Sequence, residues 1–440
     1  MANRLGYGLG DSLGMSLDYP SIPEYLNIPF NINKDEIAVL RDLAVKIREL
    51  ANRPVEAEKK ELWYKHNALE ETRPVIFCDP ENGWYEIIPS ESLKCVNPLA
   101  RIWEFRLRKE IFWGEQLKDD HVVEDIFVVH YLFRYSDFGI THHEILPDDI
   151  NGAMNWEPAI KDYSKDLPKL KTKEIIIEHE TTRRLYNLAL EVFGDVLRVQ
   201  YRSAFWGSLG MTYDLIYLRG LENVMLDMYD NPDELHQVMS ILRDDALNRL
   251  DFVEEHNLLT LNNRGSYVGS GGYGWLRALP GDDFDGIVRA KHMWGHFESQ
   301  ETTCVSPEMF AEFVFPYQKP VMERFAINCY GCCEPVHTRW DILKNAPNLR
   351  RVSVSAWTDV HYMAEALGKN YVFSWKPRPA DLAVPKINRE MISDYIKETV
   401  TATRKNNCRL EIIMKDMHTL ANNPQNAIDW VQLARKISDQ

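Results

Sequence analysis

Short apolar runs alternate with longer stretches of helical spacing from about residue 185 to the end of the chain. Such runs, bounded by turn residues, are typical of buried strands, and their alternation with helices predicts βαβ units and a parallel sheet. The predicted strands are 74–78, 196–201, 258–261, 292–297, 325–330, 349–354, 371–375 and 410–414. A closed (β/α)8 barrel, the TIM barrel, needs this many strands, so we predict the α/β class with that architecture.

Three predicted helices begin with the same pair, a capping residue followed by proline. Asn231 precedes Pro232, Ser306 precedes Pro307, and Asn423 precedes Pro424. A side-chain oxygen at the cap accepts a hydrogen bond from the first turn, and proline suits the first helical position. The helix predicted near residues 99–116 carries Arg101, Arg106, Arg108 and Lys109, which we interpret as a solvated face.

The N-terminal region has a different pattern from the rest of the chain. Residues 1–32 are rich in glycine and proline and predict an irregular arm. Asn33 and Glu36 form a capping pair ahead of apolar positions at helical spacing, which end at Pro54. We therefore expect a helical extension over residues 1–69 and a catalytic barrel over 70–440.

Two segments do not fit the alternating pattern. Residues 265–274 contain five glycines. They lack the context of a phosphate-binding loop, which leaves a mobile lid as the favoured interpretation. Residues 117–180 are mostly polar and predict no role.

Composition and charge narrow the classes of protein. The chain has 51 basic and 66 acidic residues, a net charge of −15, which disfavours a nucleic-acid surface. It contains no apolar run of membrane-spanning length, and its first twenty residues lack the pattern of a secretion signal. We expect a cytoplasmic protein with no membrane partner and reduced cysteines, and the oligomeric state stays open, a homodimer included.

The segment 325–337 carries the densest candidate chemistry. A predicted strand ends there in Cys329, Cys332, Cys333, Glu334 and His337. Thiolates at this spacing, together with imidazole, suit zinc. An equally open alternative is that some of these cysteines are small buried residues beside a strand end.

Titratable residues also follow other predicted strands. His296, Glu298 and Glu301 follow one strand, Lys376 another, and Asp416 and His418 the last. A barrel would direct all of them toward one pocket. Taken singly, each has a structural alternative as a loop charge or a cap. Trp84 and Tyr85 follow the first predicted strand, where they could wall a substrate pocket or belong to the core.

Two long blocks give the chain a family resemblance. Residues 206–232 contain Arg219-Gly-Leu-Glu-Asn and Asp227-Met-Tyr-Asp-Asn-Pro, and residues 305–317 run from Val-Ser-Pro-Glu to Phe-Pro-Tyr. These blocks resemble the uroporphyrinogen decarboxylase superfamily over about residues 185–435. The resemblance implies a (β/α)8 barrel with its pocket at the C-terminal ends of the strands.

The superfamily divides into a decarboxylase of haem synthesis and zinc-dependent methyltransferases that use a corrinoid protein. The Arg-Gln-Ala-Gly-Arg signature of the decarboxylase is absent, and the His-x-Cys zinc pattern of the methyltransferases is not matched at residues 328–332. An O-demethylase-type methyltransferase, which need not bind a substrate thiolate, fits better. The sequence shows no cobalamin-binding Asp-x-His-x-x-Gly segment, so the corrinoid, and its cobalamin-type cobalt, would belong to a separate protein.

The resemblance therefore predicts methyl transfer from a small methoxylated substrate, an aryl methyl ether, to the cobalt of a corrinoid protein. Cleaving the methyl–oxygen bond requires a Lewis-acid metal or a proton donor. We predict Glu298, Cys332, Cys333 and His418 as zinc ligands, Tyr330, Glu334 and Lys376 as catalytic groups, and Trp84, Tyr85, His296 and Glu301 as substrate-binding residues. The alternatives are a decarboxylase and a barrel that binds a ligand or a corrinoid protein without catalysis.

Overall fold

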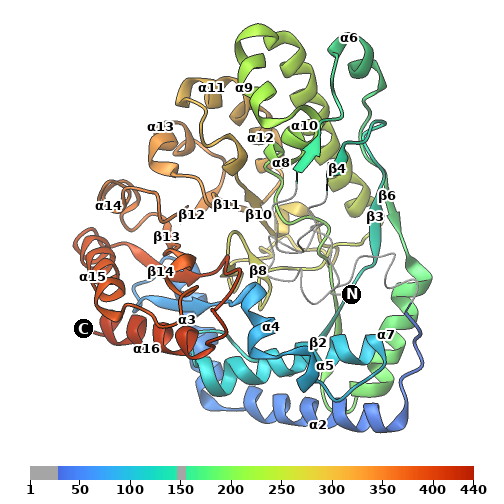
Figure 1. The fold of residues 1–440 in the computed structure, drawn as a ribbon, viewed down its shortest axis with the longest axis vertical. Coiled ribbons are helices and arrows are strands. Elements are labelled where there is room, and N and C mark those ends of the chain that lie inside the picture. The colour runs from blue at the N-terminus through green and yellow to red at the C-terminus, as the bar shows by residue number, and fades with distance from the viewer. Residues whose placement is uncertain (1–27, 146–154) are drawn as a thin grey trace.

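A parallel sheet of six strands forms the centre of the computed structural model, which describes residues 28–145 and 155–440. The order is β1-β14-β13-β12-β11-β10, so strands consecutive in the chain are neighbours and the first strand lies beside the last (Figure 1). The bounds are β1 Val75–Cys78, β10 Trp294–Phe297, β11 Ile327–Tyr330, β12 Leu349–Val354, β13 Val372–Trp375 and β14 Arg409–Met414. The predicted parallel α/β sheet is confirmed.

A second parallel sheet pairs β2 (Ile126–His130) with β7 (Arg198–Arg202). Three antiparallel pairs accompany these sheets: β3 Phe133–Tyr135 with β6 Ile175–Ile177, β4 His143–Ile145 with β5 Asn155–Glu157, and β8 Tyr267–Val268 with β9 Gly272–Tyr273. Among the described residues, backbone hydrogen bonds do not join the two parallel sheets into one closed ring of strands. Closure into a barrel therefore stays a prediction.

The predicted strand at 258–261 is wrong, because side chains take the place of a backbone ladder. The backbone N–H groups of Ser203 and Thr260 each donate to the hydroxyl of the other residue, at 2.8 and 2.9 Å. The Asn262 amide exchanges two hydrogen bonds of 2.9 Å with the backbone of Trp294. This segment thus bridges β7 and β10 without being a strand itself.

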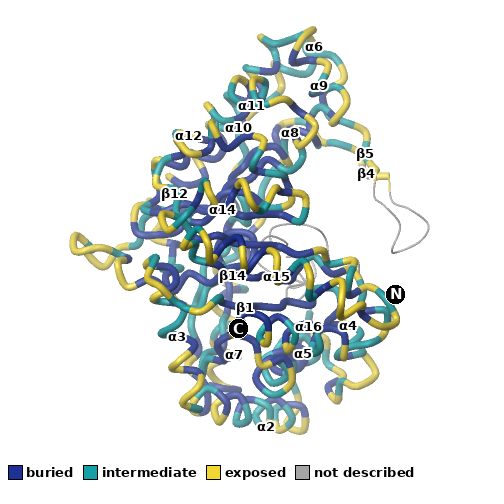
Figure 2. Tube along the Cα trace, turned by 90° about the vertical axis from the view of Figure 1, so that its left-hand side faces the viewer, coloured by how far each residue is buried: buried dark blue, intermediate teal, exposed yellow. Residues whose placement is uncertain are grey.

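The helices lie outside the sheets, and the buried positions concentrate at the centre (Figure 2). Asn33 and Glu36 form the predicted capping box, and the Ser306 hydroxyl caps α11, whereas α16 begins one residue after Pro424.

None of the described helices is long and apolar enough to cross a membrane. The helices are α2 Lys34–Ala51, α3 Pro54–Asn67, α4 Trp84–Ile87, α5 Pro98–Phe112, α6 Tyr163–Asp166, α7 His179–Phe193, α8 Thr212–Arg219, α9 Leu221–Asp230, α10 Pro232–Glu255, α11 Pro307–Phe313, α12 Phe315–Met322, α13 Trp340–Leu343, α14 Val360–Leu367, α15 Arg389–Lys405 and α16 Gln425–Ser438.

The N-terminal helix α2 packs against α5 and α7 at one end of the molecule (Figure 1). Its apolar face, including Leu40, Ala44 and Ile47, joins a hydrophobic cluster separate from the one around the main sheet. The predicted helical extension therefore contains a real, packed helix. Its predicted boundary at residue 69 stays a prediction, and most of the predicted arm lies outside the described residues.

The glycine-rich segment 265–274 forms the β8–β9 hairpin, and the prediction of a mobile lid is wrong. Residues 268–276 are all buried. A Cβ added at Gly269 would lie 2.8 Å from Cys329 Cβ, and one added at Gly272 would lie 2.6 Å from Arg351 Cζ. The glycines are needed because the hairpin backbone presses against side chains of β11 and β12.

We expect Gly269→Ala to destabilise the protein more than Gly286→Ala. Both glycines have positive φ, of 67° and 91°, so both substitutions strain the backbone. Only Gly269 also meets packed atoms, whereas nothing lies within 4 Å of a Cβ at Gly286. Overpacking should add about 1–3 kcal/mol to the loss in free energy of unfolding, measured by urea denaturation. Equal losses in the two variants would contradict this packing of the hairpin.

Candidate functional site

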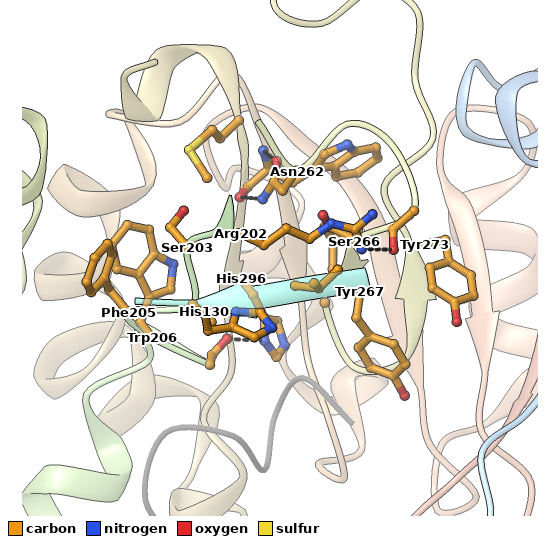
Figure 3. Close-up of a pocket in the computed structure, with 18 of the residues that line it drawn as sticks. His130, Arg202, Ser203, Phe205, Trp206, Asn262, Ser266, Tyr267, Tyr273 and His296 are labelled. Atoms are coloured by element: carbon orange, nitrogen blue, oxygen red, sulfur yellow. Dashed lines mark hydrogen bonds between the residues drawn. The ribbon is translucent and has the colours of Figure 1, made fainter. Parts of the chain in front are cut away.

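A cavity of about 190 Å3 lies at the C-terminal ends of β2, β7 and β10. The β8–β9 hairpin and the end of α5 complete its wall, and in the view of Figure 3 Phe205 and Trp206 lie on the opposite side from Tyr267 and Tyr273. Ligand sites of α/β proteins occupy this end of parallel strands. The aromatic residues of the lining are Trp113, Phe205, Trp206, Tyr267, Tyr273 and Trp294.

His296, predicted to bind substrate, lines this cavity from the end of β10. Its Nδ1 lies 3.1 Å from the carbonyl oxygen of Gly207 (Figure 3). Its Nε2 lies 3.4 Å from the carbonyl oxygen of Gly331. Burial lowers the pKa of His296 to about 4. The ring is therefore neutral near pH 7 and donates a hydrogen bond from one nitrogen only.

The predicted cysteine pair lies beyond β11, next to the hairpin. The Sγ atoms of Cys332 and Cys333 are 3.7 Å apart, and Ser270 Oγ donates to Cys332 Sγ at 3.3 Å. The hydrogen bond with Cys333 lowers the pKa of Cys332 and raises the pKa of Cys333. Of the two, Cys332 is thus the thiol more easily ionised.

Three carboxylates gather between the ends of β10 and β11. Glu334 accepts hydrogen bonds from the backbone N–H groups of Ser299 and Cys332, at 2.9 and 2.8 Å, and Glu301 accepts one of 2.6 Å from the Thr212 hydroxyl. Burial, reinforced by the charges of Glu301 and Glu334, raises the pKa of Glu298 well above its usual range. Glu298 therefore holds its proton to higher pH than an ordinary glutamate does.

Lys376 extends from the end of β13 and is buried. Its ammonium group donates to the hydroxyl and, at 3.3 Å, to the carbonyl oxygen of Ser374, and the Ser374 hydroxyl donates to Glu411. Burial lowers the pKa of Lys376 to about 8, although the Glu411 carboxylate opposes that effect. A group with such a pKa holds a proton at neutral pH and gives it up readily.

Three other predicted residues lie away from the cavity lining. Trp84 is fully buried and donates from Nε1 to Asp79 at 2.8 Å, and Tyr85 is 44% exposed and stacks on Phe105. The Tyr330 hydroxyl, which is buried, donates at 2.9 Å to Gln318 of α12 and also contacts Ser299. These contacts are those of packing residues, and we leave all three out of the proposed chemistry.

The predicted zinc ligands are not assembled into one group. Among residues 28–145 and 155–440, no three His, Cys, Asp or Glu side chains are grouped to hold a metal ion. His418 is exposed, whereas Glu298 is buried. His337 instead accepts a hydrogen bond from the backbone N–H of Asp359. The donor set does not fit a zinc site, so no step of the proposed reaction uses zinc. We expect the purified protein to contain no zinc bound by these residues, and metal analysis tests this directly.

Five basic residues of the cavity were missed by sequence reasoning: Arg106, Lys109, His121, His130 and Arg202. The solvated face predicted for α5 is wrong for Lys109, which is 3% exposed and lies over the rings of Trp84 and Trp113. Arg202 directly follows the predicted strand 196–201, so its position at a strand end was an available signal. His130 carried the same signal, because it directly follows the apolar run 126–129, whereas Arg106 carried none.

Fold and site together define an α/β protein with an aromatic-lined cavity at the C-terminal ends of parallel strands. No protein-family model matches the chain, and no curated protein matches it. Among solved structures, the chain is similar to a methyltransferase from Methanosarcina mazei, at 11% identity and a TM-score of 0.48, over 86% of this chain and 98% of that chain. Because this similarity is low, the function is inferred from the site and the sequence blocks.

Proposed function

We propose that the chain transfers a methyl group from an O-methylated aromatic molecule to the cobalt of a separate corrinoid protein, in a barrel whose first and last strands are neighbours. The main support for this proposal is the cavity. Its aromatic wall suits a single aromatic ring, and it lies at the strand ends, where the active site of a barrel is found. The sequence blocks at 206–232 and 305–317 add the resemblance to the methyltransferase branch.

The size of the cavity favours this proposal over decarboxylation of uroporphyrinogen. About 190 Å3 accommodates a small substituted ring, but a tetrapyrrole with its carboxylate side chains is far larger. The sequence also lacks the signature that binds those carboxylates in the decarboxylase. A small aryl methyl ether is therefore the better match to the space available.

In the proposed reaction, the methyl–oxygen bond breaks and the methyl carbon is transferred to nucleophilic cobalt(I). The oxygen keeps the bonding electron pair and takes up a proton, giving a phenol. We assign the proton to Lys376, whose charge acts on His296 of the cavity wall. Glu298, whose pKa is raised, and Cys332, whose pKa is lowered, lie at neighbouring strand ends.

This assignment predicts how methyl transfer depends on pH. Since Lys376 has a pKa of about 8, below the ordinary 10.5, the donor is protonated below pH 8 and is lost as the pH rises through that value. The value of kcat/KM should therefore fall above about pH 8, and Lys376→Ala should lack this limb of the profile. A wild-type profile that stays flat up to pH 10, where free lysine begins to lose its proton, would contradict the assignment.

The proposed function is tested with the purified chain, a reduced corrinoid protein and a panel of methoxylated aromatics. We expect the cobalt(I) absorbance to disappear in step with the release of a phenol. Uroporphyrinogen serves as the comparison substrate. If coproporphyrinogen forms and no methoxylated donor changes the cobalt spectrum, decarboxylation replaces methyl transfer as the function.

A further inference from the structure

Two adjacent thiols follow the end of β11, and no step of the proposed reaction uses them. Cys332 is half-buried and Cys333 is exposed, so solvent reaches the pair. Their Sγ atoms are 3.7 Å apart. A disulfide bond is about 2.05 Å long, so a short movement of one side chain would bring the two sulfur atoms to bonding distance.

Cys332 is held in place by its neighbours. Its backbone N–H donates to Glu334 at 2.8 Å, and its carbonyl oxygen accepts from the Ser353 hydroxyl at 3.1 Å. The Ser270 hydroxyl of the β8–β9 hairpin donates to its Sγ at 3.3 Å. A donor to sulfur favours the thiolate, which is the nucleophile of disulfide exchange. Cys332 is therefore the thiol that attacks first.

Cys333 is the member of the pair that can move. Its side chain is exposed, and its Sγ lies 3.9 Å from Asp416 Oδ2, a long contact that costs little to break. A disulfide between adjacent residues is strained, because their Cα atoms are about 3.8 Å apart, closer than the usual range of roughly 4.4–6.8 Å. Strained, exposed disulfides are the ones that thiols reduce readily, so a bond formed here would be reversible.

We propose that Cys332 and Cys333 are a reversible modification site, which reacts with small disulfides of the glutathione type and closes into a disulfide between the two residues. The Cys332 thiolate attacks one sulfur of the small disulfide, and the other half leaves and takes up the proton that Cys332 lost. The Cys333 thiol then gives up its proton, attacks Cys332 Sγ and releases the second half as a thiol. Two protein thiols and one small disulfide thus become one protein disulfide and two small thiols.

This site is independent of the proposed function. Neither cysteine is among the described residues that line the cavity, and the exchange uses neither a methyl donor nor a corrinoid protein. Accessible thiols with a second cysteine beside them are typical of redox sensors, because the second thiol resolves the mixed disulfide.

The test treats the folded protein with excess glutathione disulfide at neutral pH, blocks the remaining thiols with N-ethylmaleimide during denaturation, and maps the tryptic peptides by mass spectrometry. Trypsin releases residues 325–339 as one peptide, which contains Cys329 besides the pair. We expect the blocking group on Cys329 alone, and a loss of two hydrogen atoms from Cys332 and Cys333. Excess reduced glutathione should leave all cysteines of this peptide free to be blocked.

Cys333→Ser should stop the exchange at its first step, with glutathione attached to Cys332. Cys304→Ser is the matched control, because Cys304 is also exposed but lies outside the pair, and it should form the disulfide to the same extent as the wild-type protein. Wild-type protein whose paired cysteines stay free, or carry only attached glutathione, would overturn the inference without any variant. A disulfide that includes Cys329, or one that survives excess reduced glutathione, would also overturn it.

Discussion

Lys376→Ala is expected to lower kcat/KM for methyl transfer by about 10²- to 10⁴-fold, the usual contribution of a general acid. The residue is buried at the end of β13, and its pKa of about 8 gives it a proton at neutral pH that it can release. Without that proton, the departing oxygen must leave as an anion, which is a poorer leaving group. The measurement is the initial rate of phenol release at equal folded concentration.

Lys405→Ala is the matched control, because Lys405 ends α15 on the exposed surface. Its rate should equal that of the wild-type protein. If Lys376→Ala retained at least half of the wild-type rate, proton donation would have to be reassigned to another group at the strand ends, such as Glu298.

Arg351→Met is expected to lower the free energy of unfolding by about 3–5 kcal/mol, the usual cost of removing one partner of a buried ion pair. Arg351 Nε lies 3.0 Å from Glu411 Oε1 inside the sheet, and the two side chains are 2% and 0% exposed. The pair lowers the pKa of Glu411 far below its usual range, although burial alone would raise it. After the substitution, Glu411 keeps His66 and Ser374 as partners but loses its guanidinium.

Arg41→Met provides the control for this prediction. Arg41 pairs with Asp195 at 2.6 Å, but on the surface, with side chains 35% and 67% exposed. Exposed pairs contribute little, because solvent screens them, so the urea midpoint should barely move. A similarly small shift for Arg351→Met would mean that the interior of the sheet tolerates Glu411 without its guanidinium partner, and the prediction would be wrong.

The sequence predicted all six strands of the main sheet because each is a short apolar run ended by turn residues, a local property. Strands β12 and β14 match their predicted runs to within one residue. The run at 258–261 looked the same, but Ser203 and Asn262 supply side-chain hydrogen bonds in place of the ladder. Such long-range substitutions leave no trace in the local pattern.

The site was predictable only where strand ends define it. His296 reaches the cavity from near the end of a predicted strand, and the charge of Lys376, which directly follows another predicted strand, acts on His296. Trp113 and Tyr273 of the aromatic wall come from a helix end and a glycine-rich hairpin, whose positions depend on tertiary packing. Trp84 also follows a predicted strand in the sequence, yet it is fully buried and does not line the cavity.

A single-turnover reaction with a donor labelled in its methyl group tests the central claim most directly. The chain is mixed with stoichiometric cobalt(I) corrinoid protein and 4-methoxybenzoate carrying a CD3 group on oxygen, and the products are identified by mass spectrometry. We predict that the label appears on cobalt in an amount equal to the 4-hydroxybenzoate released. Label recovered as methanol or formaldehyde, or retained on the donor, would contradict methyl transfer by this protein.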